Sequence, residues 1–148
     1  MDSTDYKIIE ILQEDGRIPM KELAKRVALS APAVAERVKR LEEENIITGY
    51  KAVINYDKLG QKMSVLINVG INIQKNAEFL EFIKNEDSII ECHQVTGPYS
   101  KVLKARVEDS RNLENLIGRI QMFGKTETYV ILSSIEKEQI IRADNNDK

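Results

Sequence analysis

The sequence has little cysteine and no long apolar run, and both shortages narrow the class of protein. Cys92 is the one cysteine among 148 residues, so a disulfide within the chain is excluded and the cytoplasm is the expected compartment. No apolar run approaches the roughly 18 residues that a membrane-spanning helix needs, so no membrane partner is expected. The segment from Met1 to Tyr6 is polar and acidic, unlike a secretory signal.

Catalytic motifs are missing as well. The chain has no phosphate-binding loop, no nucleophile elbow and no metal-ligand spacing. His93 follows Cys92 directly, but neighbours on a strand point to opposite faces, so the two side chains cannot converge on one metal ion. We therefore expect no catalytic residue, no metal site, no cofactor and no enzyme activity.

The chain as a whole has no excess of positive charge, but one segment of it does. The net charge is −2. Between Arg17 and Arg40, however, seven basic residues stand against Glu22 and Glu36, which gives that segment a charge of +5 (seven minus two). Such a run, taken alone, is typical of a solvated helical face. Its meaning depends on the elements that carry it.

The first of these elements is a predicted helix before residue 15. Ile8 and Leu12 belong to an apolar stripe with helical spacing. Asp2 and Ser3 are suitable N-cap residues. We expect the helix to stop at Asp15-Gly16, where glycine can adopt the positive φ of a C-terminal cap.

Two further helices follow at short intervals. Pro19 suits the first turn of one, and Ser30 is the expected N-cap of the other, with Pro32 in its first turn. This last helix runs to about Glu44 and ends at Asn45. Its inward-facing residues are Val34, Val38 and Leu41. Two helices joined by a turn of three or four residues, the second rich in Lys and Arg, predict a helix-turn-helix.

A helix-turn-helix exposes the start of its second helix to the edges of the bases. Small residues there, namely Ala31, Ala33 and Ala35, allow close approach and contact thymine methyl groups, while Glu36 can accept a hydrogen bond from cytosine. Basic side chains and the N–H groups around Ser30 suit phosphates. The predicted DNA-binding residues are Lys21, Lys25, Arg26, Ser30, Ala31, Pro32, Ala33, Glu36, Arg37, Lys39 and Arg40. A three-helix module that binds protein is the alternative at this point.

The second half of the chain has a different pattern. A turn ending at Gly60 predicts a domain boundary, with residues 1–60 as the helix-turn-helix domain plus a linker strand and residues 61–148 as a second domain. From Val65 to Ile73 apolar residues alternate with others, as on a strand. The further expected elements are a helix over 76–85 with Phe79, Leu80 and Ile83 facing in, strands over 89–96 and 100–107, a helix capped by Ser110, and a strand over 126–135 before a charged tail.

This order of elements predicts an α+β fold. Its second domain is a ferredoxin-like βαββαβ unit, with two helices on one face of a four-stranded antiparallel sheet. The opposite face has no helix to cover it. We therefore expect a homodimer that forms through that face.

Several short motifs occur in an order that is typical of one protein family. The first half contains "DGR", "ELA", "LS" followed by "RV" and "LE", and then "GY"; the second contains "ECHQVTG" and "YVILSSI". Together they resemble the Lrp/AsnC family of leucine-responsive, or feast/famine, regulators from about Asp2 to Glu136. The resemblance implies a winged-type helix-turn-helix, sequence-specific binding to double-stranded DNA, and a transcriptional regulator in the prokaryotic cytoplasm, associated with the nucleoid. It also implies dimers that assemble further into a tetramer of dimers, an octamer.

The same resemblance implies an amino-acid effector near the turn between the second and third strands. Carried onto this chain, the effector-binding residues are Gly97, Pro98, Tyr99, Ser100, Thr126 and Thr128. Many relatives have acidic residues where this chain has Pro98 and Ser100. A carboxylate is the natural partner of an amino acid's ammonium group, and neither Pro98 nor Ser100 supplies one. The sequence is therefore compatible with an amino-acid effector, with another small effector or with no effector. The alternative function is an architectural protein that wraps DNA with little sequence choice and has no effector.

Overall fold

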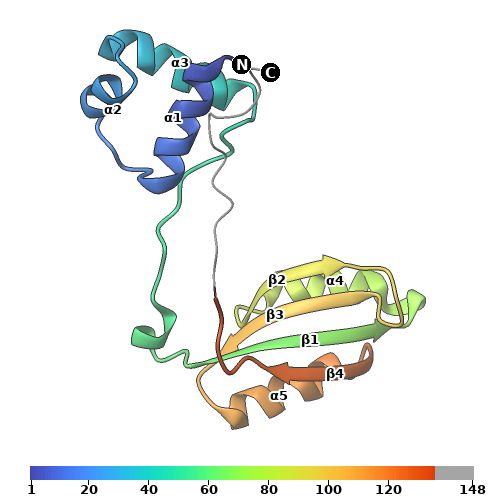
Figure 1. The fold of residues 1–148 in the computed structure, drawn as a ribbon. Helices are drawn as coiled ribbons and strands as arrows, with labels where there is room; N and C mark the ends of the chain where they lie inside the picture. Colours follow the sequence, from blue (N-terminus) through green and yellow to red (C-terminus); the bar gives the residue numbers. More distant parts are fainter. Residues whose placement is uncertain (136–148) are drawn as a thin grey trace. The chain divides into compact units, whose positions relative to one another are not determined.

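Two compact units make up the described part of the chain. The structure is a computed structural model that describes residues 1–135. Unit 1 extends from Met1 to Val53 and unit 2 from Ile54 to Ile135 (Figure 1). Each unit has a hydrophobic core of its own. The boundary expected at residue 60 falls inside unit 2, and the predicted charged tail lies outside the described residues. None of the helices in residues 1–135 has the length and hydropathy that crossing a bilayer requires.

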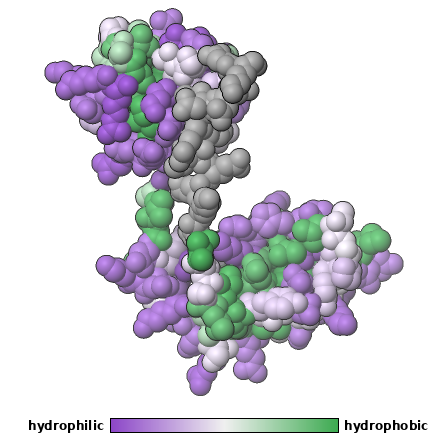
Figure 2. All heavy atoms as spheres, in the orientation of Figure 1, coloured by the Kyte–Doolittle hydropathy of each residue, from purple (hydrophilic) through white to green (hydrophobic). Residues whose placement is uncertain are grey.

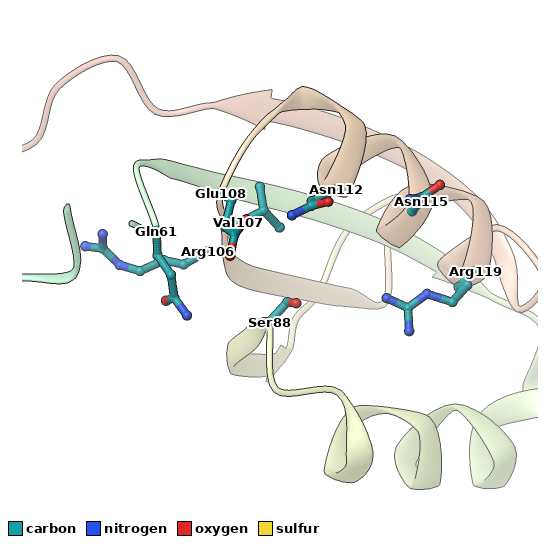
Figure 3. Close-up of a pocket in the computed structure, with 8 residues that line it drawn as sticks. All are labelled: Gln61, Ser88, Arg106, Val107, Glu108, Asn112, Asn115 and Arg119. Atoms are coloured by element: carbon teal, nitrogen blue, oxygen red, sulfur yellow. The ribbon is translucent and has the colours of Figure 1, made fainter. Parts of the chain in front are cut away.

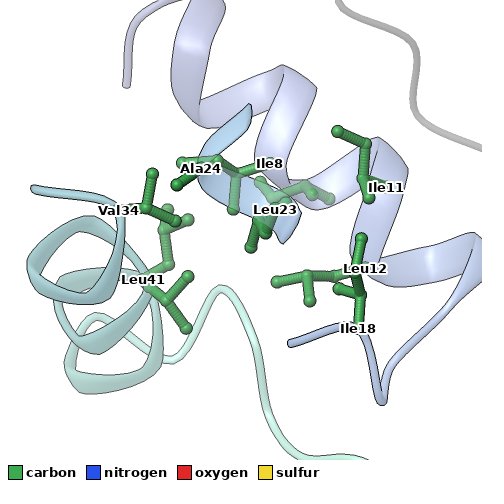
Figure 4. Packing of buried hydrophobic residues seen from close by; sticks show 10 residues of the cluster. Ile8, Ile11, Leu12, Ile18, Leu23, Ala24, Val34 and Leu41 are labelled. Carbon is green, nitrogen blue, oxygen red and sulfur yellow. The ribbon is translucent and has the colours of Figure 1, made fainter. Parts of the chain in front are cut away.

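Unit 1 consists of three helices, α1 (Ser3–Glu14), α2 (Met20–Arg26) and α3 (Ala31–Glu43). Ile8 of α1, Leu23 of α2, and Val34 and Leu41 of α3 are completely buried and meet in one core (Figure 4). These contacts confirm the predicted inward stripes. No strand forms within residues 1–53, so the linker strand expected in the first domain is not formed in that range.

The helix starts are capped as the sequence predicts. Asp2 is the N-cap residue of α1, and it forms a reciprocal capping box with Asp5. Ser30 caps α3 by accepting a hydrogen bond from the N–H of Ala33 at 3.4 Å, and Pro32 lies in the first turn. These caps fix where α3 begins, which decides which of its residues face solvent.

The turn between α2 and α3 depends on a left-handed residue that is not glycine. Ala28 has a φ of 55°. The N–H of Leu29 bonds to the carbonyl of Ala24 at 3.0 Å, and that of Ala28 to Lys25 at 3.3 Å, the paired hydrogen bonds of a Schellman motif. Asn45 ends α3 in the same way, also with a φ of 55°. The end of α1 predicted at Asp15-Gly16 is confirmed, since Glu14 is its last residue and Asp15 its C-cap, but the positive φ predicted for Gly16 is wrong.

Unit 2 has the predicted βαββαβ order and the antiparallel strand order β2-β3-β1-β4. Its elements are β1 (Met63–Ile71), α4 (Asn76–Asn85), β2 (Ile89–Gln94), β3 (Lys101–Val107), α5 (Ser110–Ile120) and β4 (Gly124–Val130), with the 3-10 turns η1 (Tyr56–Leu59) and η2 (Ile73–Lys75). Both helices cover one face of the sheet (Figure 1). The fold is therefore the ferredoxin-like arrangement predicted from the sequence. The last strand ends before residue 135, which was its predicted limit.

Three individual residues of unit 2 also differ from the prediction. Ile73 lies beyond β1 and is 91% exposed, because the chain enters η2 there. Leu80 is 40% exposed, while Phe82 packs against the core in its place. The N-cap of α5 is Asp109 instead of Ser110, since its carboxylate accepts a hydrogen bond from the first turn.

The other face of the sheet has no helix among the described residues. Leu66 lies at its centre, paired with Lys104 on β3 and with Tyr129 on β4. Leu66 is 36% exposed and Tyr129 49%. Figure 2 shows apolar side chains gathered in a band over the strands of unit 2, bordered by hydrophilic ones. We refer to this surface as the open face.

Candidate nucleic-acid interface and sensing site

Four exposed residues form a stripe along α3. Pro32, Ala35, Glu36 and Lys39 follow the spacing i, i+3, i+4 and i+7, so they share one side of the helix. The opposite side is buried against α1 and α2. The stripe begins in the first turn of α3, where a recognition helix contacts bases.

Two of the predicted contact residues lie away from this stripe. Ala31 is half-buried and packs against the core of unit 1. Ala33 is half-buried as well, and its N–H is engaged by the cap residue Ser30. The first turn of α3 therefore exposes Pro32 more fully than either alanine. The small side chain nearest to it on the stripe is Ala35.

The basic residues of unit 1 fall into two groups. Lys25 pairs with Glu22 at 3.3 Å and Lys39 with Glu43 at 3.5 Å, both along exposed helix surface. Exposed pairs of this kind contribute little stability, so these lysines are easily drawn to another anion. Three more cations have no ion pair with any residue from 1 to 135; they are Arg17, Lys21 and Arg26. Their charge is available to phosphates.

Arg37 and Arg40 are held by a buried carboxylate. Asp5 of α1 is 1% exposed, and it accepts a hydrogen bond from Arg37 at 2.8 Å and another from Arg40 at 2.8 Å. Arg37 also bonds to Asp2 at 2.8 Å. The backbone N–H of Asp2 adds a further donor to Asp5 at 3.0 Å. The buried charge is thus satisfied from three directions, as a buried carboxylate requires.

This cluster fixes α3 against the start of α1. The hydrogen bond from the Asp5 backbone and that from Arg37 hold the pKa of Asp2 below its ordinary value. The hydrogen bonds to Asp2 and Asp5 raise the pKa of Arg37. The side chain of Arg40 remains 47% exposed, so part of its guanidinium group still faces solvent. Sequence spacing did not reveal these pairs, because their partners are 32 and 35 residues apart.

A tyrosine secures the chain that leaves α3. The hydroxyl of Tyr50 donates a hydrogen bond to Glu42 at 2.9 Å, and its ring lies where a Cβ on Gly16 would be 3.4 Å away. Burial, with the Glu42 carboxylate beside it, raises the pKa of Tyr50 to about 12. Tyr50 was not singled out from the sequence either.

The six predicted effector residues do not line one pocket within the described chain. Gly97 has a φ of 118°, as a turn there requires, and Pro98 is exposed. Tyr99 lies beside Gly70, and burial together with the Glu127 carboxylate raises its pKa. Thr126 accepts a hydrogen bond from a side chain at the end of α5. Thr128 pairs with Ile67 on β1.

Ser100 is the predicted effector residue that does reach a pocket. Its hydroxyl donates to the carbonyl of Val69 at 3.4 Å and accepts from the N–H of Ile71 at 3.3 Å, which ties the turn to the end of β1. A pocket of about 280 Å³ opens there. It is lined by Ile71, Ile73, Asn76, Gln94, Ser100 and Lys101. We refer to it as the Lys101 pocket.

A second pocket, of about 260 Å³, lies beside α5 (Figure 3). It is lined by Gln61, Ser88, Arg106, Val107, Glu108, Asn112, Asn115 and Arg119. Arg119 extends from α5 toward the side that carries Ser88, and it forms an ion pair with Glu86. Burial opposes the ionisation of Glu86, but hydrogen bonds from Ser88 and Arg119 outweigh it and hold its pKa below the ordinary value. Arg106 stacks on the ring of Tyr56 at 4.8 Å.

Cys92 and His93 point to opposite faces, as predicted. Cys92 packs against the core, and burial raises the pKa of its thiol. His93 is exposed and lies 3.0 Å from Glu91, whose pKa this contact lowers. Within residues 1–135 no group of three or more His, Cys, Asp or Glu side chains is placed to hold a metal ion.

Two protein-family models match the chain, one for each unit. A model of winged helix-turn-helix DNA-binding domains matches residues 1–48, and a model of the Lrp/AsnC ligand binding domain matches residues 64–141. The chain belongs to the Lrp/AsnC family. It is a DNA-binding transcriptional regulator, and the resemblance found in its short motifs is confirmed.

Individual members of the family match over nearly the whole chain. The HTH-type transcriptional regulator YezC of Bacillus subtilis is 40% identical over 134 residues, which cover 90% of this chain and 95% of the relative. The leucine-responsive regulatory protein of Escherichia coli is 35% identical over 144 residues, covering 93% and 88%.

Solved structures of family members have the same fold. The structure of LrpC from Bacillus subtilis has a TM-score of 0.88 and 31% identity, and the match covers 93% of this chain and 99% of that one. The structure of a transcriptional regulator from Neisseria meningitidis, solved as a complex with L-Met, has a TM-score of 0.89 and 25% identity, with 95% of each chain covered.

Proposed function

We propose that this regulator reads DNA with the exposed stripe of α3 and is a dimer formed through the open face. The observation that carries the DNA-binding role is the stripe itself, Pro32, Ala35, Glu36 and Lys39, fixed from behind by a fully buried core. In this proposal residues 1–60 bind DNA and residues 61–148 sense an effector and assemble the protein. The chain acts in the cytoplasm on the nucleoid, and no catalytic step is part of its role.

The contacts divide into two kinds. Ala35 and Glu36 meet base edges in the major groove, since a methyl group suits thymine and a carboxylate accepts from cytosine. Ser30, Ala31, Pro32 and Ala33 bring the start of α3 to the DNA backbone, where its N–H groups favour an anion. The phosphate contacts come from Lys21, Lys25, Arg26, Arg37, Lys39 and Arg40. Asp5 orients Arg37 and Arg40 for this task.

The experiment for DNA binding is a titration of the full chain on the promoter of its own gene and on random duplex, repeated over a range of salt. Selective binding to the promoter is expected. Lys39→Ala is expected to weaken both affinities and make log K less steep in log salt by about one unit. Lys84→Ala, which removes an equally exposed lysine from α4, is the control and leaves both unchanged. Equal affinity for promoter and random duplex would favour the architectural alternative instead.

The dimer follows from the open face. A sheet surface with Leu66 and Tyr129 half-exposed at its centre needs a cover, and a second copy is self-complementary across a two-fold axis. Two recognition helices then meet successive major grooves of a near-palindromic site. Dimers assemble further into a tetramer of dimers.

This interface is tested by measuring the mass of the protein with light scattering as it elutes from a size-exclusion column. Leu66→Lys is expected to halve the mass of the smallest assembly, because it sets a positive charge at the centre of the interface, directly opposite Lys104. Leu80→Lys is a matched control, since Leu80 is 40% exposed against 36% for Leu66 but lies on α4. Loss of the dimer in both variants, or in neither, would contradict the assignment.

Effector sensing belongs to the end of the sheet near the turn between β2 and β3. The match to a ligand-binding domain and the L-Met complex of the Neisseria relative support a small effector there. The site residues are Gly97, Pro98, Tyr99 and Ser100, with Thr126 and Thr128 of the last strand as neighbours. An effector acts by binding one arrangement of the recognition helices more tightly than another.

A further inference from the structure

Lys101 is buried where a lysine is seldom found. It is 7% exposed and begins β3, opposite Val69 on β1. Alternate residues of β3 are buried, so Lys101 lies on the same side of the strand as Leu103, which is the side that the helices cover. Its position is therefore fixed by the register of the strand.

The ammonium group of Lys101 has no carboxylate partner among residues 1–135. Its hydrogen bond goes to the side-chain amide oxygen of Gln94, which is neutral. An ammonium group has three donors, and a buried charge is stable only when an opposite charge or a full set of acceptors meets it. The two arginines of the pocket in Figure 3 have carboxylates, Glu86 for Arg119 and Asp57 for Arg106. Lys101 lacks an equivalent.

The surroundings of Lys101 favour an anion further. Of the six residues that line the pocket, Lys101 is the one with a charge. Asn76 is the first residue of α4, and no side chain caps that helix start. The helix dipole favours negative charge at this end of α4, where Glu78 already lies in the first turn and the N–H of Asn76 already bonds to the carbonyl of Ile73. Ser100 adds no charge, and its hydroxyl already bonds to the backbone of β1.

The remaining lining is apolar. Ile73 is 91% exposed in η2 and Ile71 is half-buried at the end of β1. An isoleucine this exposed at the mouth of a pocket gains from covering by an apolar group. The volume of about 280 Å³ suits a small organic molecule of a few carbon atoms.

We infer that the Lys101 pocket binds a small carboxylate that has an apolar side chain and no ammonium group, such as a branched-chain α-keto acid. The carboxylate meets the Lys101 ammonium and the start of α4, and the side chain lies on Ile71 and Ile73. No acidic residue lines the pocket to receive an amino acid's ammonium group. The inference rests on the proposed function in that it names the effector class of unit 2.

Titration calorimetry on the full chain tests this with two probes that differ in one group. α-Ketoisocaproate and leucine share a carbon skeleton, and the keto acid is expected to bind at least about tenfold more tightly. Lys101→Met keeps the apolar stem and removes the charge, so keto-acid affinity is expected to fall at least about tenfold. Lys84→Met removes an exposed lysine of α4 and leaves the affinity unchanged.

A second variant keeps the inference testable if Lys101→Met does not fold. Asn76→Asp places a negative charge in the pocket at a helix start, where acids stabilise helices. It is expected to fold normally and to lose keto-acid binding by about tenfold or more, through repulsion. Unchanged binding in this folded variant would place the keto acid elsewhere and overturn the inference.

The other outcomes are equally decisive. Leucine binding as tightly as the keto acid would overturn the inference, and so would inorganic phosphate doing the same, because the apolar lining would then have no role. No binding by any probe, with promoter binding intact, would overturn the effector class and leave the regulator. Keto-acid binding that Lys101→Met abolishes, in a protein without promoter binding, would uphold this pocket and overturn the proposed DNA-binding role.

Discussion

Asp5→Asn is the substitution that most directly tests how α3 is held in place. It keeps the shape of a side chain that is 1% exposed and removes its charge. The two bonds from Arg37 and Arg40, each 2.8 Å long, lose their charge assistance, and the new amide group turns a donor toward one guanidinium. The third bond, from the N–H of Asp2, can persist because an amide oxygen also accepts it.

The size of the loss follows from the exposure of the partners. A hydrogen bond to a charged group is worth about 1.5–3 kcal/mol, and two are weakened. Water can compensate in part, since the side chains of Arg37 and Arg40 are 27% and 47% exposed. We therefore expect unit 1 to lose about 2–3 kcal/mol, below the full cost of breaking a buried ion pair.

Hydrogen exchange followed by mass spectrometry can localise this loss in the intact chain. Peptides from α1 and α3 are expected to exchange about 30-fold to 150-fold faster in the variant, while peptides from unit 2 keep their rates. Asp15→Asn is the control, because Asp15 is exposed and its bond to the N–H of Arg17 needs only an oxygen. Combining Asp5→Asn with Arg40→Met is expected to give a coupling energy above about 1 kcal/mol.

Two results would refute the reasoning. Exchange in α1 and α3 that stays within about threefold of wild type would mean that solvent supports the arginines as well as Asp5 does. An equal acceleration in unit 2 would mean that the substitution acts on the whole chain and not through the cluster.

Four further substitutions test other parts of the structure. Ala28→Gly is expected to raise the free energy of unfolding of unit 1 by about 1 kcal/mol, because glycine adopts a φ of 55° without strain, and a lower midpoint in urea would contradict this. Gly124→Ala would set a Cβ 2.0 Å from the carbonyl oxygen of Gly70, so a loss of about 1–3 kcal/mol or more is expected. Gly118→Ala, in a helix position with open space, gains about 1 kcal/mol; similar melting temperatures for the two variants would disprove the clash. Asp2 has a lowered pKa, so its stabilising effect is present at neutral pH and is lost as the pH falls below about 4. Asp2→Asn should flatten the dependence of the melting temperature on pH over that acid range, and an unchanged acid slope would mean that the contacts of Asp2 with the Asp5 backbone and Arg37 do not lower its pKa.

The helices of unit 1 could be predicted because their limits are set by local chemistry. Ser30 and Asp2 cap through hydrogen bonds within three residues, and Pro32 tolerates the first turn of any helix. The same locality explains the failure at Gly16. Glycine permits a positive φ without requiring it, and the neighbouring ring of Tyr50 lies where no local pattern shows it.

The site was less predictable than the fold, because its decisive contacts join distant residues. Arg37 reads as a phosphate ligand in the sequence, and its partner Asp5 reads as a first-turn acid of another helix. Burial has the same difficulty: alternation puts Lys101 on the inner side of β3, but a lysine at a strand end is usually taken as exposed. Leu80 and Phe82 exchanged roles because both lie near the edge of the inward stripe of α4.

The alternation along β3 has an evolutionary consequence. Lys101, Leu103 and Ala105 belong to the pocket and the core, whereas Lys104 and its alternate neighbours belong to the open face. One short stretch of gene therefore encodes two surfaces, interleaved codon by codon. After a gene duplication, changes at the odd-numbered positions of β3 can give one copy a new ligand. Unchanged even-numbered positions meanwhile preserve its ability to dimerise through the open face. Paralogues that answer to different metabolites could still form mixed assemblies until the second set diverges.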